Sequence, residues 1–135
     1  MGLTAGQILE ANLKNPGTYT KTEHARSPGF GAEEARWWNW LLPDAEQYTK
    51  QEHSAAPGFN ASGARWWNWR LVTAEPYTKQ EHSASPEFST RAVSDWNKMF
   101  PDAEQYTEQE YAAAPEFDIE WLYSAHRDWG LKWKS

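Results

Sequence analysis

Residues 19–46 read YTKTEHARSPGFGAEEARWWNWLLPDAE, and residues 48–75 read YTKQEHSAAPGFNASGARWWNWRLVTAE. The second stretch repeats the first with a shift of 29 positions, and two further copies follow at the same spacing. Shared tyrosine and glutamate columns run through all four copies: Tyr19, Tyr48, Tyr77 and Tyr106, and Glu23, Glu52, Glu81 and Glu110. Because several columns stay in phase, the chain is predicted to be a tandem repeat.

A short first helix is predicted at the start of each copy. Thr20 and Glu23 have the Thr-x-x-Glu spacing of a capping box, in which each side chain bonds the other residue's backbone N–H. Tyr19 and His24 occupy the two places of a hydrophobic staple. The helix must end before the proline of the Ser-Pro or Ala-Pro pair, because a residue before proline disfavours the helical conformation.

A second, longer helix is predicted to begin at that proline, which is Pro28 in the first copy. The first helical position needs no N–H, and Ser27 and Ser85 are expected to cap this helix. An apolar stripe with a spacing of four residues follows. In the third copy it consists of Phe88, Ala92, Trp96 and Phe100. Pro43 and Pro101 then end the helix, so that each copy holds two helices.

The predicted fold is all-α, a tandem array of four 29-residue two-helix repeats with an N-terminal half-repeat as a cap. The half-repeat is inferred because Leu9 and Leu13 lie one period before Trp38 and Leu42. Trp129–Ser135 breaks the register and is expected either to cover the last repeat or to anchor in a partner. The expected boundaries are 1–18 for the cap, 19–47, 48–76 and 77–105 for repeats one to three, and 106–135 for repeat four with a C-terminal cap.

The tryptophans separate into inward and outward columns. Trp38, Trp67 and Trp96 form a column that stays aromatic and is therefore expected in the core. The two other tryptophan columns hold Asp95 and Lys98 in the third copy, and charged side chains are rarely buried unpaired. The tryptophans of those columns in the first two copies are therefore expected to lie at least partly outside the core.

These outward tryptophans form the predicted partner-binding patch, since exposed aromatic patches commonly mark contact surfaces. Arg36 and Arg65 precede Trp40 and Trp69 by one helical turn, which suits cation–π contacts. The predicted site residues are Arg36, Trp37, Trp40, Arg65, Trp66 and Trp69. The alternative is that these rings fill gaps between the first two copies.

Several chemistries are disfavoured by the composition. A net charge of −6 without any Lys/Arg run argues against nucleic acid, and no apolar run approaches the roughly 18 residues of a membrane span. Without cysteine there is no thiolate metal site, and the recurrent Glu-His pair lacks the geometry of a metal site. No cofactor is expected, and haem or pigment binding by His24, His53 and His82 is the least favoured possibility. The chain shows neither a phosphate loop nor a nucleophile elbow, so it is not expected to be an enzyme.

The function predicted from the repeat is that of a non-enzymatic, multivalent structural component, a linker or scaffold in an assembly. Its expected partner is a repetitive or oligomeric protein, because linked weak sites gain avidity. The alternative is a carbohydrate-binding module that uses the outward tryptophans beside Asn39 and Asn68. The N-terminus resembles no signal peptide, so the expected location is the cytoplasm or a particle assembled inside the cell. Whether the copies stack on one another or each dock on a partner stays open.

Overall fold

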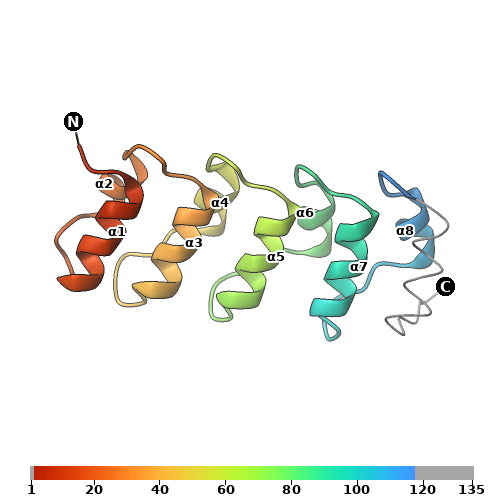
Figure 1. The fold of residues 1–135 in the computed structure, drawn as a ribbon. Helices are drawn as coiled ribbons and strands as arrows, with labels where there is room; N and C mark the ends of the chain where they lie inside the picture. Colours follow the sequence, from red (N-terminus) through yellow and green to blue (C-terminus); the bar gives the residue numbers. More distant parts are fainter. Residues whose placement is uncertain (1, 118–135) are drawn as a thin grey trace. The chain divides into compact units, whose positions relative to one another are not determined.

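The computed structural model describes residues 2–117, and over these residues every regular element is a helix (Figure 1). The predicted all-α tandem repeat is confirmed, with a long and a short helix alternating along the chain. The helices are α1 Ala5–Lys14, α2 Lys21–Ala25, α3 Ala32–Leu41, α4 Lys50–Ala55, α5 Ala61–Arg70, α6 Lys79–Ser83, α7 Thr90–Met99 and α8 Glu108–Ala113. The expected cap at Trp129–Ser135 lies outside the described residues.

The chain divides into two compact units. Met1–Tyr77 contains α1 to α5, and Thr78–Ser135 contains α6 to α8. Within the first unit α3 packs against both α1 and α5, and within the second unit α7 packs against α8. Neighbouring copies inside a unit therefore stack directly on one another, which answers part of the question that the sequence leaves open.

The short helices begin with the predicted capping boxes. At α2 the Thr20 hydroxyl accepts from the Glu23 N–H at 3.1 Å, and the Glu23 carboxylate accepts from the Thr20 N–H at 2.9 Å. The same arrangement opens α4, α6 and α8, and Thr4 with Gln7 makes it at α1. Helices of five or six residues are marginal alone, so these reciprocal bonds matter for defining where each one begins.

The long helices begin four residues later than predicted, and their start at the proline is wrong. Ser27 to Phe30 forms a turn in which the Phe30 N–H donates to the Ser27 carbonyl at 3.2 Å. Pro28 and Gly29, with φ of +82° at the glycine, are the central residues of a type II turn. The predicted serine caps are wrong as well. The hydroxyls of Ser27 and Ser85 donate to the carbonyls of Glu23 and Glu81 in the short helices.

The proline that was predicted to begin the long helix instead caps the long helix of the preceding copy. The Pro57 carbonyl accepts from the Ala32 N–H at 2.8 Å, at the first turn of α3. The equivalent bonds join Ala5 to Pro28 and Thr90 to Pro115. One of the backbone donors left unpaired at a helix start is thus satisfied by the next copy. The sequence could not reveal this, because the acceptor is a backbone carbonyl brought close by stacking.

A cluster of four rings forms the core of each complete copy. In the first, the His24 ring stacks on Trp38 with centroids 4.7 Å apart, and meets Phe30 edge-on at 5.5 Å. Tyr48 completes the cluster, with its hydroxyl 2.6 Å from His24 Nδ1. Equivalent clusters form from His53, Phe59, Trp67 and Tyr77, and from His82, Phe88, Trp96 and Tyr106. The ring that His24 meets is therefore the tyrosine of the next copy, whereas the predicted staple paired it with Tyr19.

A bidentate asparagine clamp holds each tyrosine in place. Asn39 donates to the Tyr48 carbonyl at 2.9 Å and accepts from the Tyr48 N–H at 2.8 Å. Asn68 and Asn97 hold Tyr77 and Tyr106 in the same way. The clamp pairs buried backbone groups of the linker, which would otherwise lose hydrogen bonds on leaving water.

The N-terminal half-repeat also has this clamp, but in a different register from the prediction. Asn12 clamps Tyr19 across seven residues, whereas Asn39 and Tyr48 are nine residues apart. The linker of the cap is therefore two residues shorter, and Asn12 rather than Glu10 corresponds to Asn39. The predicted match of Leu13 to Leu42 is wrong, since Leu13 is 46% exposed and Leu42 only 9%. The predicted match of Leu9 to Trp38 is wrong for the same reason, because the new register aligns Leu9 with Arg36; Leu9 is nevertheless buried in the same apolar cluster as Trp38.

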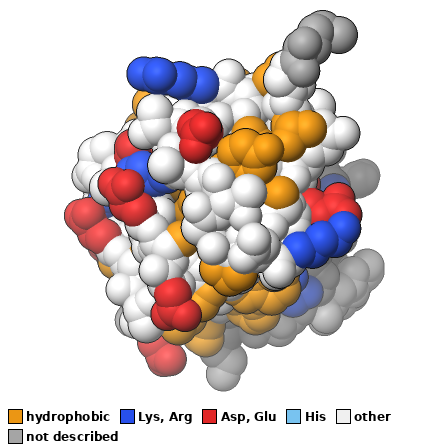
Figure 2. All heavy atoms as spheres, turned by 90° about the vertical axis from the view of Figure 1, so that its left-hand side faces the viewer, with side chains coloured by type: hydrophobic (Ala, Val, Ile, Leu, Met, Phe, Trp, Pro, Cys, Tyr) orange, Lys and Arg blue, Asp and Glu red, His pale blue; other side chains and the backbone are white. Residues whose placement is uncertain are grey.

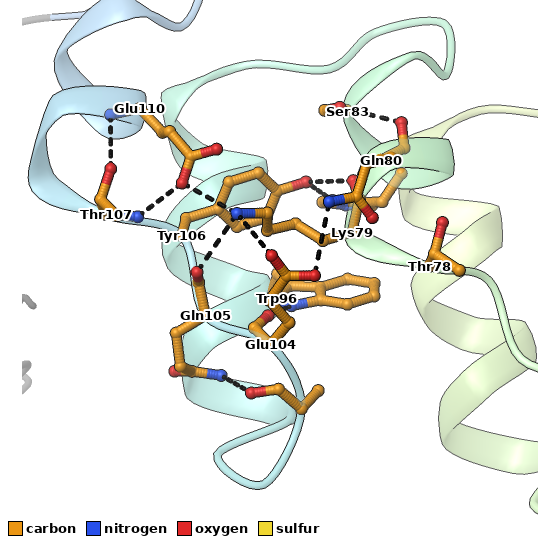
Figure 3. A network of polar contacts seen from close by, with 12 residues as sticks. Thr78, Lys79, Gln80, Ser83, Trp96, Glu104, Gln105, Tyr106, Thr107 and Glu110 are labelled. Carbon is orange, nitrogen blue, oxygen red and sulfur yellow. Dashed lines mark hydrogen bonds and ion pairs between the residues drawn. The ribbon is translucent and has the colours of Figure 1, made fainter.

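In the first and third copies a lysine joins two acidic side chains, and Figure 3 shows the one in the third copy. In the second unit Lys79 Nζ lies 3.3 Å from a Glu104 oxygen and 3.0 Å from a Glu110 oxygen, and 5.4 Å from the Tyr106 ring centroid. Lys21 makes the same contacts with Glu46 and Glu52. Glu52 and Glu110 thus serve both a capping box and an ion pair between copies. The lysine column is in phase in the sequence but was not singled out there.

Candidate functional site

The four tryptophans predicted to face outward are the most exposed large aromatic residues of α3 and α5. Trp37 is 37% exposed, Trp40 and Trp66 are 43%, and Trp69 is 51%. Trp38 and Trp67, in the neighbouring column, are each 1% exposed. The two classes follow from the helical period, which turns adjacent residues by about 100°. Seen from the side of α1 and α2, hydrophobic side chains reach the surface in separate patches among charged ones (Figure 2).

A groove of about 270 Å³ opens between α3 and α5. It is lined by Glu33, Arg36, Trp37, Trp40, Trp66 and Arg70. The structure therefore brings together Arg36, Trp37, Trp40 and Trp66 from the predicted set. Arg65 and Trp69, the other two predicted residues, do not line this groove. We call the pocket lined by Glu33, Arg36, Trp37, Trp40, Trp66 and Arg70 the aromatic groove.

Glu33 and Arg70 are the residues of the aromatic groove that the sequence did not predict, and Arg70 lies against two of the rings. Its guanidinium carbon lies 4.4 Å from the Trp40 ring centroid and 5.5 Å from that of Trp66. The predicted cation–π pairs used Arg36 and Arg65 instead. The Arg70 column reads Leu41 in the first copy and Met99 in the third, so no repeated pattern marks it. One available signal is the four-residue spacing from Trp66, which places the two side chains on one helix face.

Arg36 lines the groove and contacts the next copy. Its Nη1 lies 3.1 Å from Nε2 of His53, so His53 accepts there and carries its proton on Nδ1. That Nδ1–H donates to the Tyr77 oxygen at 2.6 Å, and the Tyr77 hydroxyl donates to the Lys50 carbonyl at 3.0 Å. Burial, with a smaller contribution from the Arg36 charge, lowers the pKa of His53 to about 3. His53 is therefore neutral at physiological pH.

Gly63 makes room for this contact. A Cβ at that position would lie 2.8 Å from Nη1 of Arg36. Gly58 and Gly63 occur in the second copy, and each has a structural reason. Gly58 has a φ of +78° and holds the left-handed position of its turn. Gly63 lies inside α5, where glycine lowers helix stability, and its lack of a side chain admits the guanidinium.

The opposite wall of the aromatic groove is built on α3. The Trp37 indole N–H donates to a Glu33 oxygen at 3.2 Å, one helical turn away. The Trp37 and Trp40 rings lie side by side, with centroids 5.5 Å apart and planes tilted by 50°. The Trp40 ring on α3 and the Trp66 ring on α5 both lie against the Arg70 guanidinium, and Trp37 in turn contacts Trp40 and Glu33.

Comparison of the chain with models of protein families, with curated proteins and with solved structures gives no match. The site is therefore described from its own geometry. In the part of the chain that the structure describes, no three His, Asp or Glu side chains are grouped so that they could hold a metal ion. No helix among residues 2–117 is both long and apolar enough to cross a membrane.

The histidines that the sequence offered as ligands are buried in the ring clusters. His24, His53 and His82 are each 0% exposed, and each has Nδ1 within 2.7 Å of a tyrosine hydroxyl. The Nε2 of His24 lies 3.2 Å from a Glu34 oxygen. Asn39 and Asn68, placed beside the tryptophans in the carbohydrate hypothesis, hold the tyrosine linkers instead. Their amides therefore do not line the aromatic groove.

Proposed function

We propose that the chain is a non-enzymatic binding protein, a structural component whose stacked repeats present the aromatic groove to a protein partner. The observation that carries the proposal is the guanidinium of Arg70 held between Trp40 and Trp66. Tryptophan and arginine are the residue types most often responsible for affinity at protein interfaces. Groups whose positions are already restrained lose less conformational entropy when they bind.

The proposal places the contact at one groove rather than at all copies equally. The histidine, tyrosine and lysine columns shared by the copies are engaged in internal contacts, so they offer little for a partner. The aromatic groove depends on residues that only the first two copies have. We therefore expect an oligomeric or repetitive partner to bind one chain at each of its equivalent sites, so that the chain is a structural component of the assembly with one contact per copy of the partner rather than the multivalent linker expected from the repeat.

The carbohydrate alternative has less support. It relied on Asn39 and Asn68 as polar groups beside the rings, and both amides are bonded to tyrosine backbone. The polar groups that line the aromatic groove are instead charged, namely Glu33, Arg36 and Arg70. Carbohydrate binding is therefore kept as a possible outcome of the test below.

The test compares three immobilised proteins: the wild type, the double variant Trp40→Ala/Trp66→Ala, and Trp69→Ala. Trp69 is a matched control because it is at least as exposed as the other two but does not line the groove. Extract of the source cells supplies candidate partners, and each candidate is then purified and titrated. We expect the double variant to weaken binding at least about tenfold and Trp69→Ala to leave it nearly unchanged.

Circular dichroism shows whether the three proteins are equally helical, so that a loss of binding is not a loss of fold. Equal binding by all three proteins would overturn the proposal, because the aromatic groove would not be the contact. A glycan array run with the same proteins separates the two functions. If a glycan binds the wild type and Trp69→Ala but not the double variant, the ligand of the aromatic groove is a carbohydrate rather than a protein.

A further inference from the structure

We propose that the aromatic groove recognises an acidic peptide segment, in which a carboxylate binds Arg70 and a neighbouring apolar side chain packs on the tryptophans. This inference rests on the proposed function and adds the chemistry of the ligand. It depends on which parts of Arg70 are already engaged, on the charges around it, and on the size of the groove.

The known contacts of Arg70 in the groove are with rings, since its guanidinium carbon lies 4.4 Å from the Trp40 centroid and 5.5 Å from that of Trp66. The five N–H donors of a guanidinium point outward in its plane, and a tryptophan ring takes up none of them as a conventional acceptor would. Within residues 2–117 Arg70 has no hydrogen bond and no ion pair with another side chain. The residue is also exposed. A planar fork of donors is the arrangement that binds a carboxylate through two parallel hydrogen bonds.

The charges around the groove favour an anionic ligand. Arg36 and Arg70 are positive and Glu33 is the single negative residue of the lining. The Glu33 carboxylate accepts from the Trp37 indole, and no ion pair of 4.0 Å or less joins it to Arg70 in the described part of the chain. Arg36 is directed to His53, so its own charge is partly buried. Arg70 therefore carries the uncompensated charge that a ligand can reach.

The size and lining of the groove favour a short segment rather than a folded surface or a polyanion. A volume of about 270 Å³ is at the lower end of pockets that hold small ligands, so two or three residues would fill it. Trp37 and Trp40 supply exposed ring surface next to Arg70 for one apolar side chain. The net charge of −6 for the whole chain opposes long polyanions such as nucleic acid. A single carboxylate beside an apolar residue meets all three conditions.

The experiment uses a random heptapeptide library displayed on phage and selected on the full chain. We expect the recovered peptides to contain Asp or Glu next to an aromatic or aliphatic residue. One such peptide is then synthesised together with its Asn or Gln counterpart. Both are titrated against the wild type, Arg70→Met and Trp69→Ala. Methionine is chosen because Met99 holds the same position in α7, so the repeat accepts it.

Loss of a charge-assisted pair is expected to weaken binding about ten- to a hundredfold. Arg70→Met and the Gln peptide should each cause this loss, and the combination should add little, because both remove the same contact. Trp69→Ala should bind like the wild type. One result would overturn the acidic-peptide inference but leave the proposed groove intact. In that result the selected peptides bind Trp40→Ala/Trp66→Ala more weakly, contain no preferred Asp or Glu, and bind Arg70→Met as tightly as the wild type. If no selected peptide depends on Trp40 or Trp66, the proposed groove itself fails.

Discussion

Helices α5 and α7 occupy the same place in their copies, but only one of them carries an aromatic surface. Their inward residues agree closely. Trp67 and Trp96 are 1% and 2% exposed, and both donate an indole N–H over 2.9 Å to a linker carbonyl. Their outward residues differ, because Trp66, Trp69 and Arg70 in α5 are replaced by Asp95, Lys98 and Met99 in α7.

This difference separates the residues that build the repeat from those that make one copy distinct. The ring cluster and the asparagine clamp are present in both helices, so they suffice for the local fold whatever faces outward. The outward columns do not take part in the ring cluster or the clamp, so the local fold does not restrict them. In these columns the first two copies have tryptophans and the third copy does not. A binding function is therefore best sought where the copies differ.

The largest expected effect comes from testing the two tryptophan columns against each other. Trp67→Ala removes a buried ring that stacks on His53 at 4.7 Å and should lower the free energy of unfolding by about 3–5 kcal/mol. Trp96→Ala should cost a similar amount. Trp66→Ala removes an exposed ring and should cost less than about 1 kcal/mol. Urea denaturation followed by circular dichroism measures all three. Equal losses for Trp66→Ala and Trp67→Ala would contradict the division into inward and outward columns.

The second prediction compares the ring clusters of His24 and His53. Nε2 of His24 lies beside Glu34, whereas Nε2 of His53 lies beside Arg36. In the native state the pKa of His53 is about 3, against 6.5 for an unperturbed histidine. The unfolded chain therefore binds a proton that the folded chain does not between these values. Above about pH 6.5 the His53 ring is neutral in both the folded and the unfolded chain, so its titration does not change the free energy of unfolding. Below it, the free energy of unfolding should fall by about 1.4 kcal/mol per pH unit, down to about pH 3.

The ring proton signals of His53 and His24, followed by NMR during acid titration, check this expectation. Burial also lowers the pKa of His24, but Glu34 opposes that shift, whereas Arg36 adds to it at His53. His24 should therefore titrate at the higher pH. Arg36→Leu, which introduces the residue type of Leu9 in the cap, should raise the pKa of His53. A His53 signal that titrates near pH 6.5 in the folded wild type would contradict the neutral, buried ring.

The smallest effect compares the turns of the two units. Gly58 in the first unit and Glu87 in the second hold the same turn position, with φ of +78° and +63°. Gly58→Ala should cost about 1 kcal/mol, because residues with a Cβ are strained there. Glu87→Gly should gain less than about 1 kcal/mol, since the added freedom of the unfolded chain offsets part of the relief. Thermal denaturation measures both, and Glu87→Ala serves as the control that removes the side chain but keeps the strain.

The sequence predicted the short helices better than the long ones. Thr20 and Glu23 define a helix start through contacts three residues apart, and such local signals are visible in one copy. Pro28 was misread because a proline suits both the first helical position and the second position of a type II turn. The following glycine favours the turn, and the N–H of Ala5 donates to the Pro28 carbonyl only after the copies have stacked.

The candidate site was predicted in part for a related reason. The exposure of Trp40 and Trp66 follows from comparing columns across copies, which needs no coordinates. The placement of Arg70 between them does not, because Trp40 belongs to α3 and Arg70 to α5. The same holds for Gly63, whose missing side chain accommodates Arg36 from the neighbouring copy.

By itself, the sequence of this protein determined the repeat period, the capping boxes and the side of each helix that faces inward, since all three depend on spacing along the chain. Tertiary structure alone decided that His24 meets Tyr48, that Pro57 caps α3, and that Arg70 lies against two tryptophans. Each of these contacts joins neighbouring copies or their linkers. Their geometry depends on how closely the helices pack, and the pattern within a single copy does not record that distance.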